Sequence, residues 1–117
     1  MRINITLDCN DLDGQARFWS AVLAFPAEVV VPGAYVALAG PSFALTLQRV
    51  PERKTAKNRM HLDLLVLDLD AELARIEALG ATRITPVPRQ MYGERWLVLA
   101  DPEGNEFCLG IESRPED

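Results

Sequence analysis

The chain has 117 residues, of which 49% are hydrophobic and 25% charged, and its net charge is −5. This size and composition predict one compact globular domain, and an acidic balance without a basic run excludes nucleic acid and anionic membrane surfaces as expected partners. The two cysteines, Cys9 and Cys108, are too few for a disulfide framework, and no apolar run approaches a membrane span. We therefore expect a cytoplasmic protein without a signal peptide.

The first half of the chain predicts one strand, one helix and three further strands. Alternating apolar residues predict a strand over residues 2–7, after which Asp11 or Asp13 caps a helix that runs to about Ala24. A Pro32-Gly33 turn between residues 28–31 and 35–39 predicts a hairpin, and a longer strand follows over 43–50. The apolar stripe expected on the helix comprises Ala16, Phe18, Trp19, Ala21, Val22 and Leu23.

The second half repeats this order after an exposed linker over residues 51–58. A strand over 59–67 leads into a helix over 68–79 that ends at Gly80. Residues 82–87 predict a short strand broken by prolines, 89–93 a loop, and 94–100 and 106–111 two strands joined by a tight turn over 101–105. We thus expect one domain with module one at 1–50, module two at 59–112 and a polar tail at 113–117. The buried stripe of the second helix is expected to be Leu69, Leu73, Ile76 and Leu79.

The strand over 59–67 carries the only histidine of the chain, His61. Its alternation places His61, Asp63 and Leu65 on one face. The other face, which should point into the core, comprises Met60, Leu62, Leu64 and Val66.

The two halves match each other at a constant offset. Placing the Asp-Leu-Asp at 11–13 on the same tripeptide at 68–70 gives an offset of 57, and the same offset lays Asn4 on His61 (61 minus 4). A register kept from strand through helix cap indicates two copies of one supersecondary unit.

A βαβββ unit used twice, with Asp-Leu-Asp opening each helix and Asp-Pro-Glu-Gly-Asn-Glu-Phe at 101–107, resembles the vicinal oxygen chelate superfamily. Within it, the chain is most similar to small glyoxalase-like domains, a group that also resembles bleomycin-resistance proteins. The resemblance implies an α+β fold in which two βαβββ modules form an incomplete barrel around a cavity, with the helices outside. The two modules can pair with each other within one chain or with the modules of a second chain, and both arrangements remain open here. We expect a homodimer.

The resemblance also implies where a metal would be held. In the metal-dependent members, ligands come from the first and last strands of each module, and the matching positions here are Asn4, Gln48, His61 and Cys108. Only His61 keeps a usual ligand type, since the position that is typically Glu is Cys108. Because amide oxygens are weak donors for a divalent ion, we expect no cofactor. If a metal is bound, we expect His61 and Gln48 to hold it.

His61 has three interpretations. It is a structural histidine bonded to Asp63 or Asn4, a group that contacts a ligand or transfers a proton with Asp63 orienting it, or a metal ligand. Asp63 lies roughly 7 Å along the strand, so direct contact requires side-chain reach. For Cys108, apolar neighbours favour a buried, inert thiol.

A ligand pocket would take further residues from the inward faces of the strands. Pockets for small molecules are mostly apolar with a few placed polar groups. Together with the residues above, the candidates are Thr6, Thr46, Tyr92, Arg95, Trp96 and Glu106.

The sequence therefore predicts a protein that binds a small organic ligand in the cavity between its modules, without a complete catalytic metal site. The alternative is a divalent-metal-dependent lyase, isomerase or dioxygenase-like enzyme that uses His61. A third hypothesis is an accessory module that assembles with another protein. Fold alone does not choose among these classes.

Overall fold

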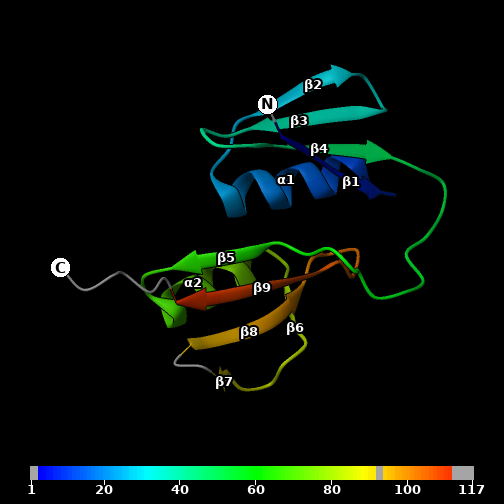
Figure 1. Cartoon of the computed structure of the whole chain (residues 1–117). Helices are drawn as coiled ribbons and strands as arrows, with labels where there is room; N and C mark the ends of the chain where they lie inside the picture. The colour runs from blue at the N-terminus through cyan, green and yellow to red at the C-terminus, as the bar shows by residue number, and fades with distance from the viewer. Residues whose placement is uncertain (1–2, 92–93, 112–117) are drawn as a thin grey trace. The chain divides into compact units, whose positions relative to one another are not determined.

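The computed structural model describes residues 3–91 and 94–111. The chain divides into an N-terminal unit, Met1–Thr55, and a C-terminal unit, Ala56–Asp117, each with its own sheet and helix (Figure 1). The division falls inside the segment expected to be a linker. Two sheets and two helices in this order confirm the predicted α+β class with two related modules.

The N-terminal unit is a four-stranded sheet with one helix along it (Figure 1). Its elements are β1 (Asn4–Cys9), α1 (Leu12–Leu23), β2 (Ala27–Val31), β3 (Tyr35–Ala39) and β4 (Ala44–Arg49), in the sheet order β1-β4-β3-β2. Strand β1 is parallel to β4, a pairing that needs a long connection, which α1, β2 and β3 supply here. The Asp11 carboxylate caps α1 by accepting from Gly14 N at 3.1 Å.

Helix α1 packs against β3 and β4. Its buried residues are Leu12, Gln15, Phe18, Trp19 and Val22. Ala21, expected in the apolar stripe, is exposed, because it lies on the far side of the helix from Trp19 and Val22.

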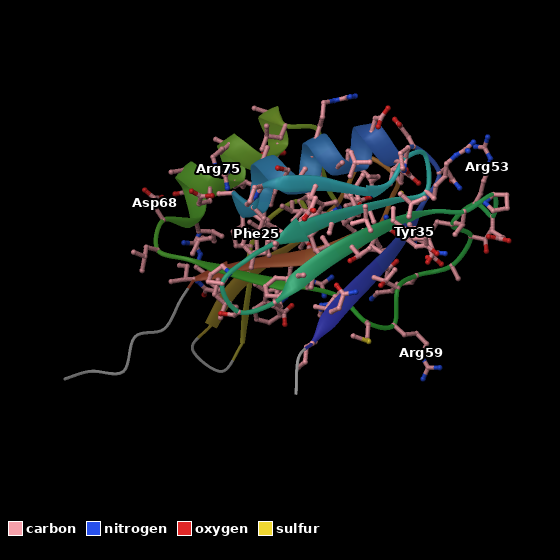
Figure 2. All side chains as sticks on the ribbon, turned by 90° about the horizontal axis from the view of Figure 1, so that it is seen from above. Phe25, Tyr35, Arg53, Arg59, Asp68 and Arg75 are labelled. Carbon is pink, nitrogen blue, oxygen red and sulfur yellow. The ribbon has the colours of Figure 1, made fainter. Side chains whose placement is uncertain are left out.

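The C-terminal unit has the sheet order β5-β9-β8-β6, and β7 also pairs with β8. Its elements are β5 (Asp63–Val66), α2 (Leu69–Ala78), β6 (Thr82–Arg83), β7 (Arg89–Met91), β8 (Glu94–Ala100) and β9 (Glu106–Ile111). Asp68 caps α2, and Figure 2 labels it with Arg75 on the same helix. Leu69, Leu73 and Ile76 are buried as predicted, whereas Leu79 is 39% exposed because the helix has already ended there.

The strand predicted over 59–67 is shorter than its alternation suggested. Regular pairing begins at Asp63, and the residues before it belong to the connector, where the Arg59 side chain points away from the ribbon (Figure 2). Met60 was expected in the core and is 81% exposed. From His61 to Val66 the alternation holds, with His61, Asp63 and Leu65 exposed and the residues between them half-buried.

The loop expected over 89–93 was also wrong in part, since Arg89–Met91 is strand β7. Strands β6 and β7 both run antiparallel to β8, separated by Pro86 and Pro88. Proline has no N–H to donate to a ladder, so the prolines split one edge strand into two short pieces. A strand of three residues, two of them polar, carries too little alternation to be detected from sequence.

The turn over 101–105 is structural, as expected. The Asp101 side chain is buried, and its Oδ1 accepts from Glu103 N and Asn105 N at 2.9 Å each. Among the described residues, neither helix is long and apolar enough to cross a membrane.

Candidate functional site

The two faces of the C-terminal sheet differ in burial. Leu97, Leu99, Phe107 and Leu109 are at most 1% exposed and share one face, and helix α2 packs against β9. Cys108 lies between two of these residues on β9, so its side chain projects from the opposite face, where it is half-buried. This opposite face, here called the open face, carries the candidate site.

Strand register brings Asp63 and Cys108 together. Strands β5 and β9 are parallel, and Asp63 is the direct partner of Cys108. On the other side of β9, Val98 of β8 is opposite Cys108. The sheet therefore places a carboxylate beside a thiol on the open face.

His61 completes a compact cluster with these two residues. Its Nδ1 lies 3.1 Å from Asp63 Oδ1, although the two residues are two positions apart along the chain. One potential ligand atom from each of His61, Asp63 and Cys108 lies within 4.8 Å of the others. Imidazole nitrogen, carboxylate oxygen and thiol sulfur are thus within reach of one small species.

Burial raises the pKa of the Cys108 thiol above its ordinary value. The Asp63 carboxylate raises this pKa further through its negative charge and by accepting a hydrogen bond from the thiol, whereas Lys57 and Arg89 lower it. The resting side chain is therefore a protonated thiol rather than a free thiolate nucleophile.

The N-terminal unit carries neutral counterparts of the cluster. At the offset of 57, His61 corresponds to Asn4 and Asp63 to Thr6 (63 minus 6), and Thr6 is the direct partner of Thr46 across the parallel β1–β4 pair. Thr46 Oγ1 donates to Asn4 Oδ1 at 2.9 Å. Thr46 therefore occupies the position that Cys108 holds in the C-terminal unit.

The other predicted site residues are spread over both units. Gln48 lies two residues beyond Thr46 on β4, and its Nε2 donates to the Tyr35 hydroxyl at 3.2 Å. Glu106 Oε2 accepts a hydrogen bond from Asn58 N at 3.2 Å. This bond links β9 to the connector that leads to His61. Tyr92 lies outside the described residues.

Trp96 and Arg95 occupy opposite faces of β8. A Cβ atom built on Gly110 would lie 3.5 Å from Trp96 Cβ and 3.6 Å from Leu65 Cδ2, so Trp96 and Leu65 flank Gly110 on the open face. Trp96 is half-buried and Leu65 exposed. An apolar surface therefore adjoins the polar cluster, and Arg95 is not part of it.

Sequence reasoning missed two cations near the cluster and the pairing of Asp63 with Cys108 within it. Lys57 and Arg89 come from the connector and from β7, and no local pattern predicts that their charges reach Cys108. The half-burial of Cys108 had a signal in the alternation of β9, because Phe107 and Leu109 fill the core face on either side.

A family model for the glyoxalase-like domain matches residues 4–110. The chain belongs to this family. As a glyoxalase-like domain it is a member of the vicinal oxygen chelate superfamily, and the predicted resemblance is confirmed.

The curated proteins that match part of this glyoxalase-like domain include uncharacterised mycobacterial proteins. Uncharacterised proteins of Mycobacterium bovis and Mycobacterium tuberculosis strain H37Rv are each 41% identical over 49 residues, which is 42% of this chain. The match spans 32% and 29% of those two proteins, so the aligned part is about a third of their length.

Solved structures share the fold of this glyoxalase-like domain. A glyoxalase/bleomycin resistance protein/dioxygenase family enzyme from Burkholderia phytofirmans is 19% identical, with a TM-score of 0.79 over 92% of this chain and 95% of its own. The fosfomycin resistance protein FosX from Mesorhizobium loti is 16% identical, with a TM-score of 0.75 over 97% and 92%. Lactoylglutathione lyase from Agrobacterium tumefaciens is 21% identical, with a TM-score of 0.70 over 95% and 92%.

The matching positions of the N-terminal unit hold the amides of Asn4 and Gln48 and the hydroxyl of Thr46, which are neutral and therefore weaker donors to a hard divalent ion than carboxylates. The donors of the C-terminal unit, in contrast, are a nitrogen, an oxygen and a sulfur. This set suits an ion of the zinc class.

Proposed function

We propose that this glyoxalase-like domain binds a small organic ligand on the open face of its C-terminal sheet, without requiring a metal. The observation that carries the proposal is the juxtaposition of the cluster of His61, Asp63 and Cys108 with the apolar surface of Trp96 and Leu65. Small-molecule sites combine a mostly apolar lining with a few placed polar groups.

The polar groups of this site are suited to hold one end of a ligand. His61 and Asp63 are hydrogen-bonded to each other. Their side chains are 43% and 60% exposed, so a ligand can reach both without displacing core residues. A ligand with a planar apolar body and one hydrogen-bonding end would contact Trp96 with the body and the cluster with the polar end.

The test is a thermal-shift screen of planar and aromatic metabolites, followed by fluorescence titration. Occupancy at 100 times the dissociation constant stabilises a protein by about 2.7 kcal/mol, which gives a measurable shift. The chain has two tryptophans, and Trp19 is buried in the N-terminal unit, so Trp19→Phe leaves Trp96 as the single reporter. A true ligand should change Trp96 emission and bind more weakly to Asp63→Asn.

Thr46→Val is the matched control, since it alters the corresponding position of the other unit and should leave binding unchanged. Ligands that bind equally well to the wild type and Asp63→Asn, with no change in Trp96 emission, would contradict this location. No shift across a broad screen, together with a stable partner protein recovered from cells, would favour an accessory module instead.

The second candidate is a divalent-metal-dependent lyase, isomerase or dioxygenase-like enzyme. The donor set of His61, Asp63 and Cys108 supports it, and among the structural neighbours one is described as a lyase and another as a family enzyme. A bound ion would supply Lewis-acid polarisation of substrate oxygens. Turnover that requires added metal and is lost in His61→Ala would favour this candidate over simple binding.

We further propose that the protein is a cytoplasmic homodimer. Cys9 and Cys108 are not joined by a disulfide, which suits a reducing compartment. Strand β2 is an edge strand on which Val29, Val30 and Val31 are 63%, 57% and 44% exposed, and an uncovered edge of this kind favours association. Light scattering coupled to gel filtration should give twice the mass of one chain.

A further inference from the structure

Three different donor atoms meet on the open face of the C-terminal sheet. They come from β5, β9 and the connector before β5, and lie within 4.8 Å of one another. In a tetrahedral zinc site with bonds of about 2.0–2.3 Å, ligand atoms are separated by about 3.3–3.8 Å. The longest separation must therefore shorten by about 1 Å, which rotation of partly exposed side chains such as His61 and Asp63 can supply.

We propose that His61, Asp63 and Cys108 form a three-ligand site for a zinc-class ion, built entirely within the C-terminal unit. The proposal deepens the second candidate function, because it names the ion class and all three protein ligands. It is independent of organic-ligand binding, since the ion would bind to the protein alone.

The donor chemistry selects the class of ion. Thiolate sulfur and imidazole nitrogen favour zinc and its neighbours in the first transition row, whereas magnesium and calcium require oxygen ligands. The corresponding positions of the N-terminal unit, Asn4, Thr6 and Thr46, offer only neutral amide and hydroxyl groups. One unit can therefore hold the ion and the other cannot.

The charges of the site balance when the ion is bound. The Cys108 thiol loses its proton to solvent as the sulfur–metal bond forms, so a neutral imidazole, one carboxylate and one thiolate face a doubly charged cation. The Asp63–His61 contact must open or be shared, because both groups turn donor atoms toward the ion. Three protein ligands leave one of four positions for a small molecule, the pattern of reactive rather than purely structural zinc sites.

The decisive experiment uses the full untagged chain, stripped with chelator and titrated with Co²⁺ and with Zn²⁺. Cobalt should give a thiolate-to-metal charge-transfer band, and zinc should displace it at one ion per chain. Cys108→Ser should abolish the band, while His61→Ala and Asp63→Asn should each weaken zinc binding by about tenfold or more.

Two matched controls come from the chain itself. Cys9→Ser removes the other thiol, which is 2% exposed and lies in the N-terminal unit, and it should leave the cobalt band unchanged. Thr46→Val changes the counterpart of Cys108 and should leave zinc affinity unchanged. Thermal melts of each apo variant show whether a lost site reflects lost folding.

The site is overturned if stoichiometric zinc does not bind, if the cobalt band is absent, or if folded Cys108→Ser retains wild-type zinc affinity. Zinc bound without any metal-dependent turnover would support the site and remove the enzyme candidate. Organic ligands that bind the stripped protein would leave the ligand-binding proposal standing whatever the zinc result.

Discussion

Asp63 and Cys108 are direct partners across the parallel pair of β5 and β9, and the carboxylate accepts a hydrogen bond from the thiol. Burial and this pairing both raise the pKa of the thiol, and the pairing places it close to His61. The chemistry of the open face therefore depends on one register between two strands that are distant in the chain.

Asp63→Asn should make Cys108 react faster with iodoacetamide at a fixed mildly alkaline pH. The thiolate is the reactive form, and the variant removes a negative charge that raises the thiol pKa, so a larger fraction is ionised. Mass spectrometry of the alkylation rate against pH should give a profile displaced to lower pH. Both proteins would carry Cys9→Ser so that Cys108 is the only thiol.

An equal or slower rate in Asp63→Asn would contradict this account of the Cys108 environment. Asp8→Asn is the control, because Asp8 is an exposed carboxylate on β1 of the other unit. Its alkylation profile should coincide with that of the parent.

Raising the pH into the alkaline range should lower the free energy of unfolding of the wild type more than that of Cys108→Ser. Because the folded-state pKa of Cys108 is raised, the unfolded chain loses the thiol proton first, and the free energy of unfolding declines as the pH passes above about 8.5 towards the folded-state pKa. Urea denaturation at neutral and at alkaline pH, compared between the two proteins, isolates this group from other titrations. A parallel decline in both proteins would count against the raised pKa.

Much of the fold is predictable because its signals are local. The predicted bounds of β3, β8 and β9 agree with the structure, and both helix caps, Asp11 and Asp68, are aspartates placed directly before an apolar helical stripe. The predicted strand bounds were wrong where the local sequence pattern is weak. Prolines divided the β6–β7 edge, and the alternation before Asp63 extended by chance to Met60.

The site was less predictable because it depends on pairing between distant segments. Alternation showed that His61 and Asp63 share a face, but nothing in either strand specifies that Cys108 lies opposite Asp63. The same limit made Gln48, rather than Thr46, the apparent counterpart of Cys108, because loop lengths differ between the two modules.

Asp101→Ala should be strongly destabilising although Asp101 lies in a turn. Its buried carboxylate accepts hydrogen bonds from the backbone N–H groups of Glu103 and Asn105 and from Asn105 Nδ2. Removing the acceptor leaves buried donors unpaired, at a cost of about 2 kcal/mol or more. Urea denaturation should show this loss, whereas Pro102→Ala, at an exposed neighbouring position, should change stability far less.

Gly40→Ala should destabilise the N-terminal unit through a clash with one side chain. A Cβ atom at Gly40 would overlap the ring of Phe25, a residue labelled in Figure 2. This ring packs edge-on against Phe43, with ring centroids 5.3 Å apart. Displacing a packed ring typically costs about 1–3 kcal/mol. The loss should be visible in the urea midpoint.

The cause can be isolated with a double-mutant cycle, because Phe25→Ala removes the ring that the new methyl group would meet. Phe25→Ala alone should also destabilise the unit, since the contact with Phe43 is lost. In that background, however, Gly40→Ala should cost little, so the two substitutions should be clearly non-additive. Additive losses would mean that Gly40 is required for its backbone and not for the space it leaves to Phe25.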